Sequence, residues 1–170
     1  MDIRRWMGLI FFGLTIILVV SLAPSIQTAN NTAYLSYNGS SEKASMVGLG
    51  VIMPWGDLLI IISILVAAGL LSVQLNKGGS IEDVIAPVGT VIGCVILLNF
   101  YDTIITSFNT LIAGTTSAGA QIFYGAILLL IYLAIVGSAG ASQVVRYFKG
   151  KKKTGKNGKK NENAPSIMNP

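Results

Sequence analysis

The chain has 170 residues, of which 52% are apolar and only 11% are charged. A soluble domain carries about 25% charged residues, so this composition argues against a soluble globular protein. The sequence contains no histidine and one cysteine, Cys94, which excludes disulfides within the chain, His/Cys zinc sites and histidine-dependent catalytic triads. We therefore expect no catalytic residue, no metal site and no cofactor site, and a protein that is not an enzyme.

The first apolar segment covers residues 7–23 and contains no charged residue. A helix needs about 20 mostly apolar residues to cross the hydrocarbon core of a bilayer, and weakly polar flanks extend this segment to that length. Its basic start and the sequence Ser21-Leu22-Ala23 would also suit a cleaved signal peptide. Pro24 would then directly follow the cleavage point, which argues against cleavage, so we expect a retained membrane helix.

Three further apolar runs follow, at residues 58–73, 84–98 and 122–136. The runs are continuous rather than alternating, which favours helices over the strands of a closed barrel. The predicted fold is all-α: an integral membrane protein with four transmembrane helices arranged as two helical hairpins. Its expected parts are a first hairpin at 1–74 with a polar outer loop at 27–45, a cytoplasmic loop at 75–83, a second hairpin at 84–145 with an outer loop at about 109–120, and a basic disordered tail at 146–170.

The lysines and arginines predict the orientation of the spans. Arg4 and Arg5 precede the first span, Lys77 lies between the second and third, and eight basic residues follow the fourth. Only Lys43 falls on the opposite side. Because cytoplasmic loops are enriched in Lys and Arg, both termini are expected in the cytoplasm, or in a virion interior.

Two glycosylation sequons lie in the first outer loop. They are Asn30-Asn31-Thr32 and Asn38-Gly39-Ser40. Both fall on the side of the membrane where glycan transfer occurs, so Asn30 and Asn38 are possible glycosylation sites. The alternative is chance, because the motif is short and the loop is rich in Asn, Ser and Thr.

The two hairpins resemble tandem copies of one unit. Asn31-Thr32 corresponds to Asn109-Thr110, and Gly50 corresponds to Gly125. Both hairpins enter from the same side, so the copies would be parallel repeats. Two hydrophobic hairpins with polar loops would also look alike by composition alone.

Small residues indicate where helices pack. Gly89 and Gly93 form a GxxxG pair in the third span, and Gly137 and Ala141 form a looser pair in the fourth. In lipid, close contact through small residues replaces the hydrophobic drive between helices. These residues are candidate helix-packing sites, either within the chain or between chains.

Asp57 follows Pro54-Trp55-Gly56 at the start of the second span. An acidic residue inside a bilayer would suggest an ion relay. Trp55 is typical of the membrane interface, so we expect Asp57 to be interfacial instead.

The tail from residue 146 to 170 holds eight basic residues and one acidic residue. It has too few apolar residues to fold alone. It would act as a solvated topology determinant, or contact anionic lipid headgroups or, non-specifically, nucleic acid phosphates. The residues expected to make such contacts are Lys149, Lys151, Lys152, Lys153, Lys156, Lys159 and Lys160.

The first hairpin reads as an apolar span, then Leu22-Ala23-Pro24-Ser25-Ile26, a short Asn/Thr/Gly/Ser loop and a span opened by Gly-rich apolar residues. This pattern resembles the small two-span hairpin proteins of archaea and their viruses, and is similar to capsid proteins of spindle-shaped archaeal viruses. The resemblance covers residues 7–74 and 84–141. It implies a self-assembling membrane shell whose basic tail faces packaged DNA.

The expected function is structural: self-association in a membrane, or packing within a larger membrane complex. The expected partners are the lipid bilayer and either copies of the chain or other membrane subunits. The alternative is a small oligomeric channel or holin-like pore, which would need a polar stripe along one helix. Thr90, Asn99 and Thr106 are the residues that would form such a stripe.

Overall fold

The computed structural model describes residues 3–38, 48–77 and 82–161, and these residues are almost entirely helical. The elements are α1 (Ile3–Asn38), α2 (Leu49–Ile52), the short 3-10 helix η2 (Met53–Trp55), α3 (Gly56–Leu75), α4 (Glu82–Ala113) and α5 (Ala118–Asn161). Four helical segments are long and apolar enough to cross a membrane: Trp6–Asn38, Leu49–Leu75, Ile85–Ala113 and Ala118–Ala141. The all-α fold with membrane-spanning helices is therefore confirmed.

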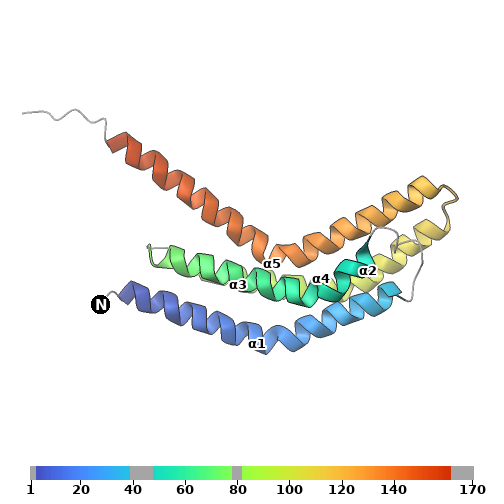
Figure 1. Ribbon diagram of the computed structural model, residues 1–170, viewed down its shortest axis with the longest axis horizontal. Helices are drawn as coiled ribbons and strands as arrows, with labels where there is room; N and C mark the ends of the chain where they lie inside the picture. The colour runs from blue at the N-terminus through green and yellow to red at the C-terminus, as the bar shows by residue number, and fades with distance from the viewer. Residues whose placement is uncertain (1–2, 39–47, 78–81, 162–170) are drawn as a thin grey trace, which may run out of the picture.

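The helices form a long bundle, in which α1 packs against α3 and α4, and α5 packs against the same two helices (Figure 1). The end of α1 and the α4–α5 turn lie at one end of the bundle, which we call the loop end. The start of α1 and the end of α3 lie at the opposite, terminal end. Consequently α1 runs parallel to α4, and α3 runs parallel to α5, which is the arrangement that parallel tandem copies would give.

Two helices bend, and each bend has a local cause. In α1 the bend lies near Pro24, which has no N–H to donate to the preceding turn. In α5 the bend falls in the small-residue stretch 137–142, after which the helix leaves the bundle. There the Ser138 hydroxyl donates to the carbonyl oxygen of Ile135 at 2.7 Å, and side-chain bonds to the preceding turn often accompany bends in helices.

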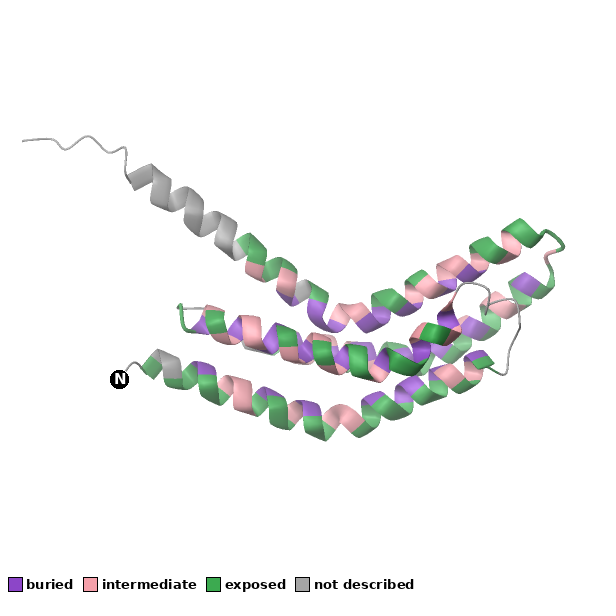
Figure 2. Cartoon of the chain, in the orientation of Figure 1, coloured by how far each residue is buried: buried purple, intermediate pink, exposed green. Residues whose placement is uncertain are grey.

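Buried side chains run along the inner faces of the helices, and the outer faces are exposed (Figure 2). The largest buried side chains are two tyrosines, Tyr101 and Tyr132, at the centre of a core otherwise made of aliphatic residues. Many large apolar side chains are exposed on the outside, among them Leu9, Ile62 and Ile96. Outer faces of this kind suit contact with lipid rather than water.

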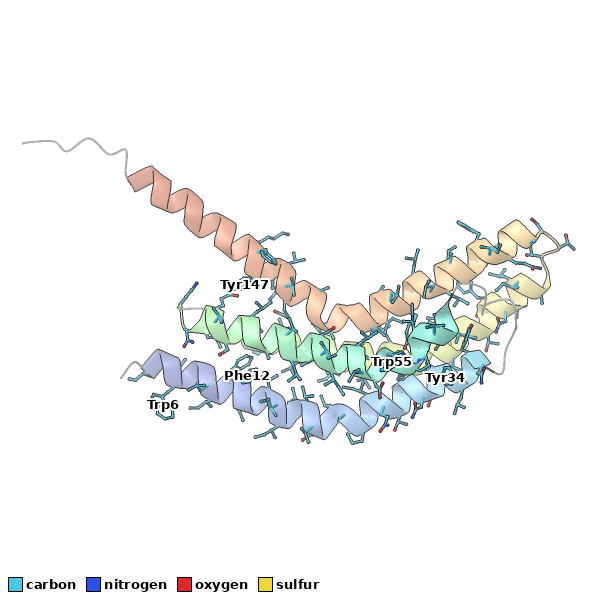
Figure 3. The ribbon with its side chains drawn as sticks, in the orientation of Figure 1. Trp6, Phe12, Tyr34, Trp55 and Tyr147 are labelled. Carbon is cyan, nitrogen blue, oxygen red and sulfur yellow. The ribbon has the colours of Figure 1, made fainter. Side chains whose placement is uncertain are left out.

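The length of α3 suits a single crossing of a bilayer. Its 20 residues span about 30 Å, which matches the thickness of the hydrocarbon core. Trp55 lies just before α3, and Trp6 lies near the terminal end of α1 (Figure 3). Both tryptophans are exposed, as expected for side chains at the two membrane interfaces. The 36 residues of α1 span about 54 Å, so α1 is longer than a single crossing of the hydrocarbon core requires.

The expected outer loops are mostly helical, which corrects the sequence interpretation. Within the range 27–45, α1 continues to Asn38 and residues 39–47 lie outside the described part of the chain. In the second hairpin α4 continues to Ala113, leaving a turn at 114–117. Thr28, Thr32 and Thr110 each donate a hydroxyl hydrogen bond to the carbonyl four residues earlier, so these polar residues remain inside helices.

The basic tail also differs from the expectation of disorder. Residues 146–161 continue α5 as a helix, while 162–170 lie outside the described residues. Lysine is a good helix former, and no proline occurs between the start of α5 and Pro165. The favourable position of positive charge near a helix C-terminus adds to this preference.

Candidate functional site

A buried hydrogen-bond cluster joins the helices at the centre of the bundle. The Asn30 amide nitrogen of α1 donates to the carbonyl oxygen of Met53 at 2.9 Å. The Tyr132 hydroxyl of α5 lies 2.5 Å from Asn30 Oδ1 and 3.2 Å from the same Met53 carbonyl. Asn30 is 1% exposed and Tyr132 is fully buried. Three segments far apart in sequence are therefore tied together by one buried amide and one buried hydroxyl.

Gly56 provides the space for this cluster. A Cβ at this position would overlap both the Tyr132 hydroxyl and the Asn30 side-chain oxygen. A second close approach lies farther along α3, where a Cβ on Gly140 of α5 would come within 2.9 Å of the Ser63 carbonyl oxygen. These two glycines let α3 and α5 pack closely on each other.

The α4 helix joins the cluster through Tyr101 and Cys94. The Tyr101 hydroxyl donates to the Leu128 carbonyl at 3.1 Å, and its ring lies 5.4 Å from the Tyr132 ring. The Cys94 thiol donates to the Ile135 carbonyl at 2.9 Å. These polar groups are paired with one another and enclosed by apolar side chains. The cluster therefore holds the helices together and leaves no polar group for a ligand.

The sequon at Asn30 does not hold a usable glycosylation site in the folded chain. Asn30 is buried, and its nitrogen and oxygen both form hydrogen bonds. A glycan on this nitrogen would remove the bond to Met53 and force the helices apart, so this prediction is corrected. Asn38 is exposed at the end of α1 and stays a predicted site.

The predicted packing residues do not make close helix contacts within the chain. A Cβ on Gly89, Gly93 or Gly137 would meet no atom of the described chain within 4 Å. Gly89 is exposed on α4, and Ala141 is exposed on α5. Close packing inside the chain uses Gly56 and Gly140 instead.

Among the predicted polar residues, Asp57, Asn99 and Thr106 lie toward the loop end. Asp57 lies in the first turn of α3, where its Oδ1 accepts the Leu58 backbone N–H at 2.9 Å, which is consistent with an interfacial position. Asn99 and Thr106 are exposed on one face of α4. Thr90 lies nine residues before Asn99, about half a rotation away, so these three residues do not form one stripe.

Among the predicted basic contacts, Lys149 is exposed on α5 beyond the bend. The side chains of the six other lysines lie outside the described residues. These positions remain predictions.

Sequence reasoning missed the apolar surface of α5 at the loop end. Ile122, Phe123 and Leu130 are 50%, 62% and 66% exposed. The Tyr101–Leu128 hydrogen bond aligns this part of α5 with the segment of α4 where exposed residues become polar. The apolar run of α5 is therefore displaced along the bundle relative to those of the other helices. The sequence alone does not reveal this displacement, because it does not give the register of α5 against the neighbouring helices.

The chain was compared with protein-family models, curated proteins and solved structures, and none of the three comparisons gives a match.

Proposed function

We propose that this chain is a non-enzymatic structural membrane protein that assembles with copies of itself in the bilayer. The observation that carries the proposal is the displaced apolar surface of α5, formed by Ile122, Phe123 and Leu130. Ile122 and Phe123 lie toward the loop end from α3, beside polar stretches of α1 and α4, and Leu130 lies near the level at which α3 starts. Large apolar surface in such a position is unfavourable in water and is typical of a protein contact.

The outward GxxxG pair on α4 supports the same proposal within the bilayer. Gly89 and Gly93 are not used for close packing inside the chain, and Ile92 and Ile96 beside them are about half exposed. Small residues flanked by aliphatic side chains allow two helices to approach closely in lipid. A lateral array formed through α4 and α5 would suit a virion envelope or capsid-like shell, or a packing subunit in a larger complex.

The terminal end supplies a second contact in this proposal. The basic segment from Arg146 onward continues α5 away from the bundle. With both termini in the cytoplasm or virion interior, its lysines would contact anionic lipid headgroups or nucleic acid phosphates without sequence preference.

The oligomeric state of the full chain, reconstituted into phosphatidylcholine nanodiscs and vesicles, tests the proposal. Phe123→Ser with Leu130→Ser should weaken self-association about tenfold or more, because two apolar side chains leave the interface. Leu35→Ser is the matched control, since Leu35 is a similarly exposed apolar residue of the loop end on α1. A wild-type chain that stays monomeric at all protein-to-lipid ratios would refute the proposal.

A second variant pair tests the contact within the bilayer. Gly89→Leu with Gly93→Leu should reduce association, because leucine side chains prevent close approach. Gly13→Leu is the control, because a Cβ there also meets nothing within 4 Å, but on α1. The alternative, an oligomeric channel, is tested in the same vesicles: ion flux that scales with oligomer content would favour it over a purely structural role.

A further inference from the structure

Two grooves follow one another along the seam between α1 and α4. The groove nearer the terminal end has a volume of about 380 Å³ and is lined mainly by Phe11, Leu14, Ile17 and Leu18 of α1 and Val88 of α4. The groove nearer the loop end has a volume of about 440 Å³ and is lined by residues that include Ser25, Thr28 and Asn99. Pro24, Ala29 and Val95 also line the loop-end groove, so the seam is apolar toward the terminal end and mixed, with more polar groups, toward the loop end.

Thr28, in the loop-end groove, lies near the level at which α3 starts. The Asn30–Met53 hydrogen bond places the α1 segment just before Asn30 level with the start of α3. Trp55 marks the interface at that level. With the bilayer placed over α3, the apolar groove lies within the hydrocarbon layer, and the Thr28 end of the loop-end groove lies near the headgroup layer.

The polar groove offers hydrogen-bond acceptors. The Thr28 hydroxyl donates to the Pro24 carbonyl at 2.8 Å, so its oxygen lone pairs face outward. The Asn99 amide nitrogen donates to the Val95 carbonyl at 2.9 Å, and the described residues give its Oδ1 no donor. Among the side chains that the structure describes, no lysine or arginine lines either groove. A phosphate would find no cationic partner here, whereas a headgroup hydroxyl would find two acceptors.

We propose that the α1–α4 seam binds one membrane lipid with an uncharged, hydroxyl-bearing headgroup. The headgroup hydroxyls donate to Thr28 Oγ1 and Asn99 Oδ1, and one acyl chain lies along Leu18, Leu14 and Phe11 toward the terminal end. The order of polar and apolar lining matches the order of headgroup and chain in a lipid.

The position of the chain is tested with the full-length protein in phosphatidylcholine vesicles that contain a neutral galactosyl diacylglycerol with a photoreactive acyl chain. Labelling should concentrate on residues 11–18 of α1 and around Val88 of α4. Equal labelling of the exposed faces of α3 and α5, or crosslinks between two copies through this seam, would overturn the proposal.

Headgroup recognition is tested by native mass spectrometry of the protein extracted from the same vesicles. The wild-type chain should retain one galactolipid in preference to phosphatidylcholine by about tenfold, because two hydrogen bonds distinguish the headgroups. Thr28→Val with Asn99→Leu should abolish this preference while leaving the helical content unchanged, because both side chains are exposed. An unchanged preference, or equal retention of both lipids by the wild type, would overturn the proposal.

A groove-filling variant checks occupancy independently. Ser25→Trp should release the lipid, whereas Gln27→Trp, an exposed residue of α1 outside both grooves, should retain it. If both variants retain the galactolipid equally, the lipid binds elsewhere and the seam assignment is wrong.

Discussion

The Tyr132 hydroxyl and the Asn30 amide oxygen meet at the centre of the bundle, although 102 positions separate them in the chain. The contact joins the first helix of the first hairpin to the last helix of the second. In an apolar interior, leaving either partner unpaired is costly. This pair therefore holds the two hairpins in one register.

Tyr132→Phe should lower the free energy of unfolding in detergent micelles by about 1–3 kcal/mol, because Asn30 Oδ1 is left buried without a donor. Tyr147→Phe is the control, since Tyr147 lies on α5 beyond the bend and is only partly buried. Denaturant unfolding followed by circular dichroism gives both values. Equal stability of the two variants would show that the buried hydroxyl contributes nothing.

Gly56→Ala should destabilise the fold more strongly than Tyr132→Phe. The added Cβ overlaps both hydrogen-bonded side chains, so it removes the bond and also forces α3 away from its neighbours. Overpacking of this kind costs about 1–3 kcal/mol in addition to the lost bond. Gly13→Ala, in open space, should instead be neutral or stabilising by up to about 1 kcal/mol. Melting temperatures of the two variants in the same detergent provide the comparison.

Expression in a glycosylating host should give a chain modified at Asn38 and never at Asn30 in the folded protein. Asn38 is exposed at the end of α1, whereas Asn30 is buried and bonded through both amide atoms. A glycan slows the chain in gel electrophoresis, and an endoglycosidase abolishes this shift. Asn38→Gln should therefore abolish the same shift. A shift that persists in Asn38→Gln and disappears in Asn30→Gln would contradict this placement.

The proposed topology predicts which engineered cysteines react with a membrane-impermeant maleimide. In a Cys94→Ala background, Thr116→Cys in the α4–α5 turn should be labelled in sealed, right-side-out vesicles. Lys149→Cys should be labelled only after permeabilisation, because it lies toward the opposite end of the bundle. In the unsubstituted chain, the buried Cys94 should stay unlabelled both before and after permeabilisation. Labelling of Lys149→Cys before permeabilisation would show that the chain has the opposite orientation.

The sequence predicts the number of spans well because each long apolar run must be helical in lipid. It fails at the helix ends, where Gln27, Thr28 and Asn31 look like loop residues. Their segment stays helical because it packs against a distant part of the chain, and its threonines satisfy their hydroxyls on the preceding turn. The burial of Asn30 depends on Met53 and Tyr132, which no local pattern reveals. The register of α5 is hidden for the same reason.

The helical continuation of α1 past the level of Trp55 has a consequence for how an assembly of this protein would look. The part of α1 beyond this level is about 15 Å long, so a sheet of aligned molecules would carry a layer of protein over one lipid leaflet. In cross-sectional electron micrographs, such a sheet would show a third dense line outside the two headgroup lines. Sugars attached to Asn38 would lie at the outer edge of that protein layer.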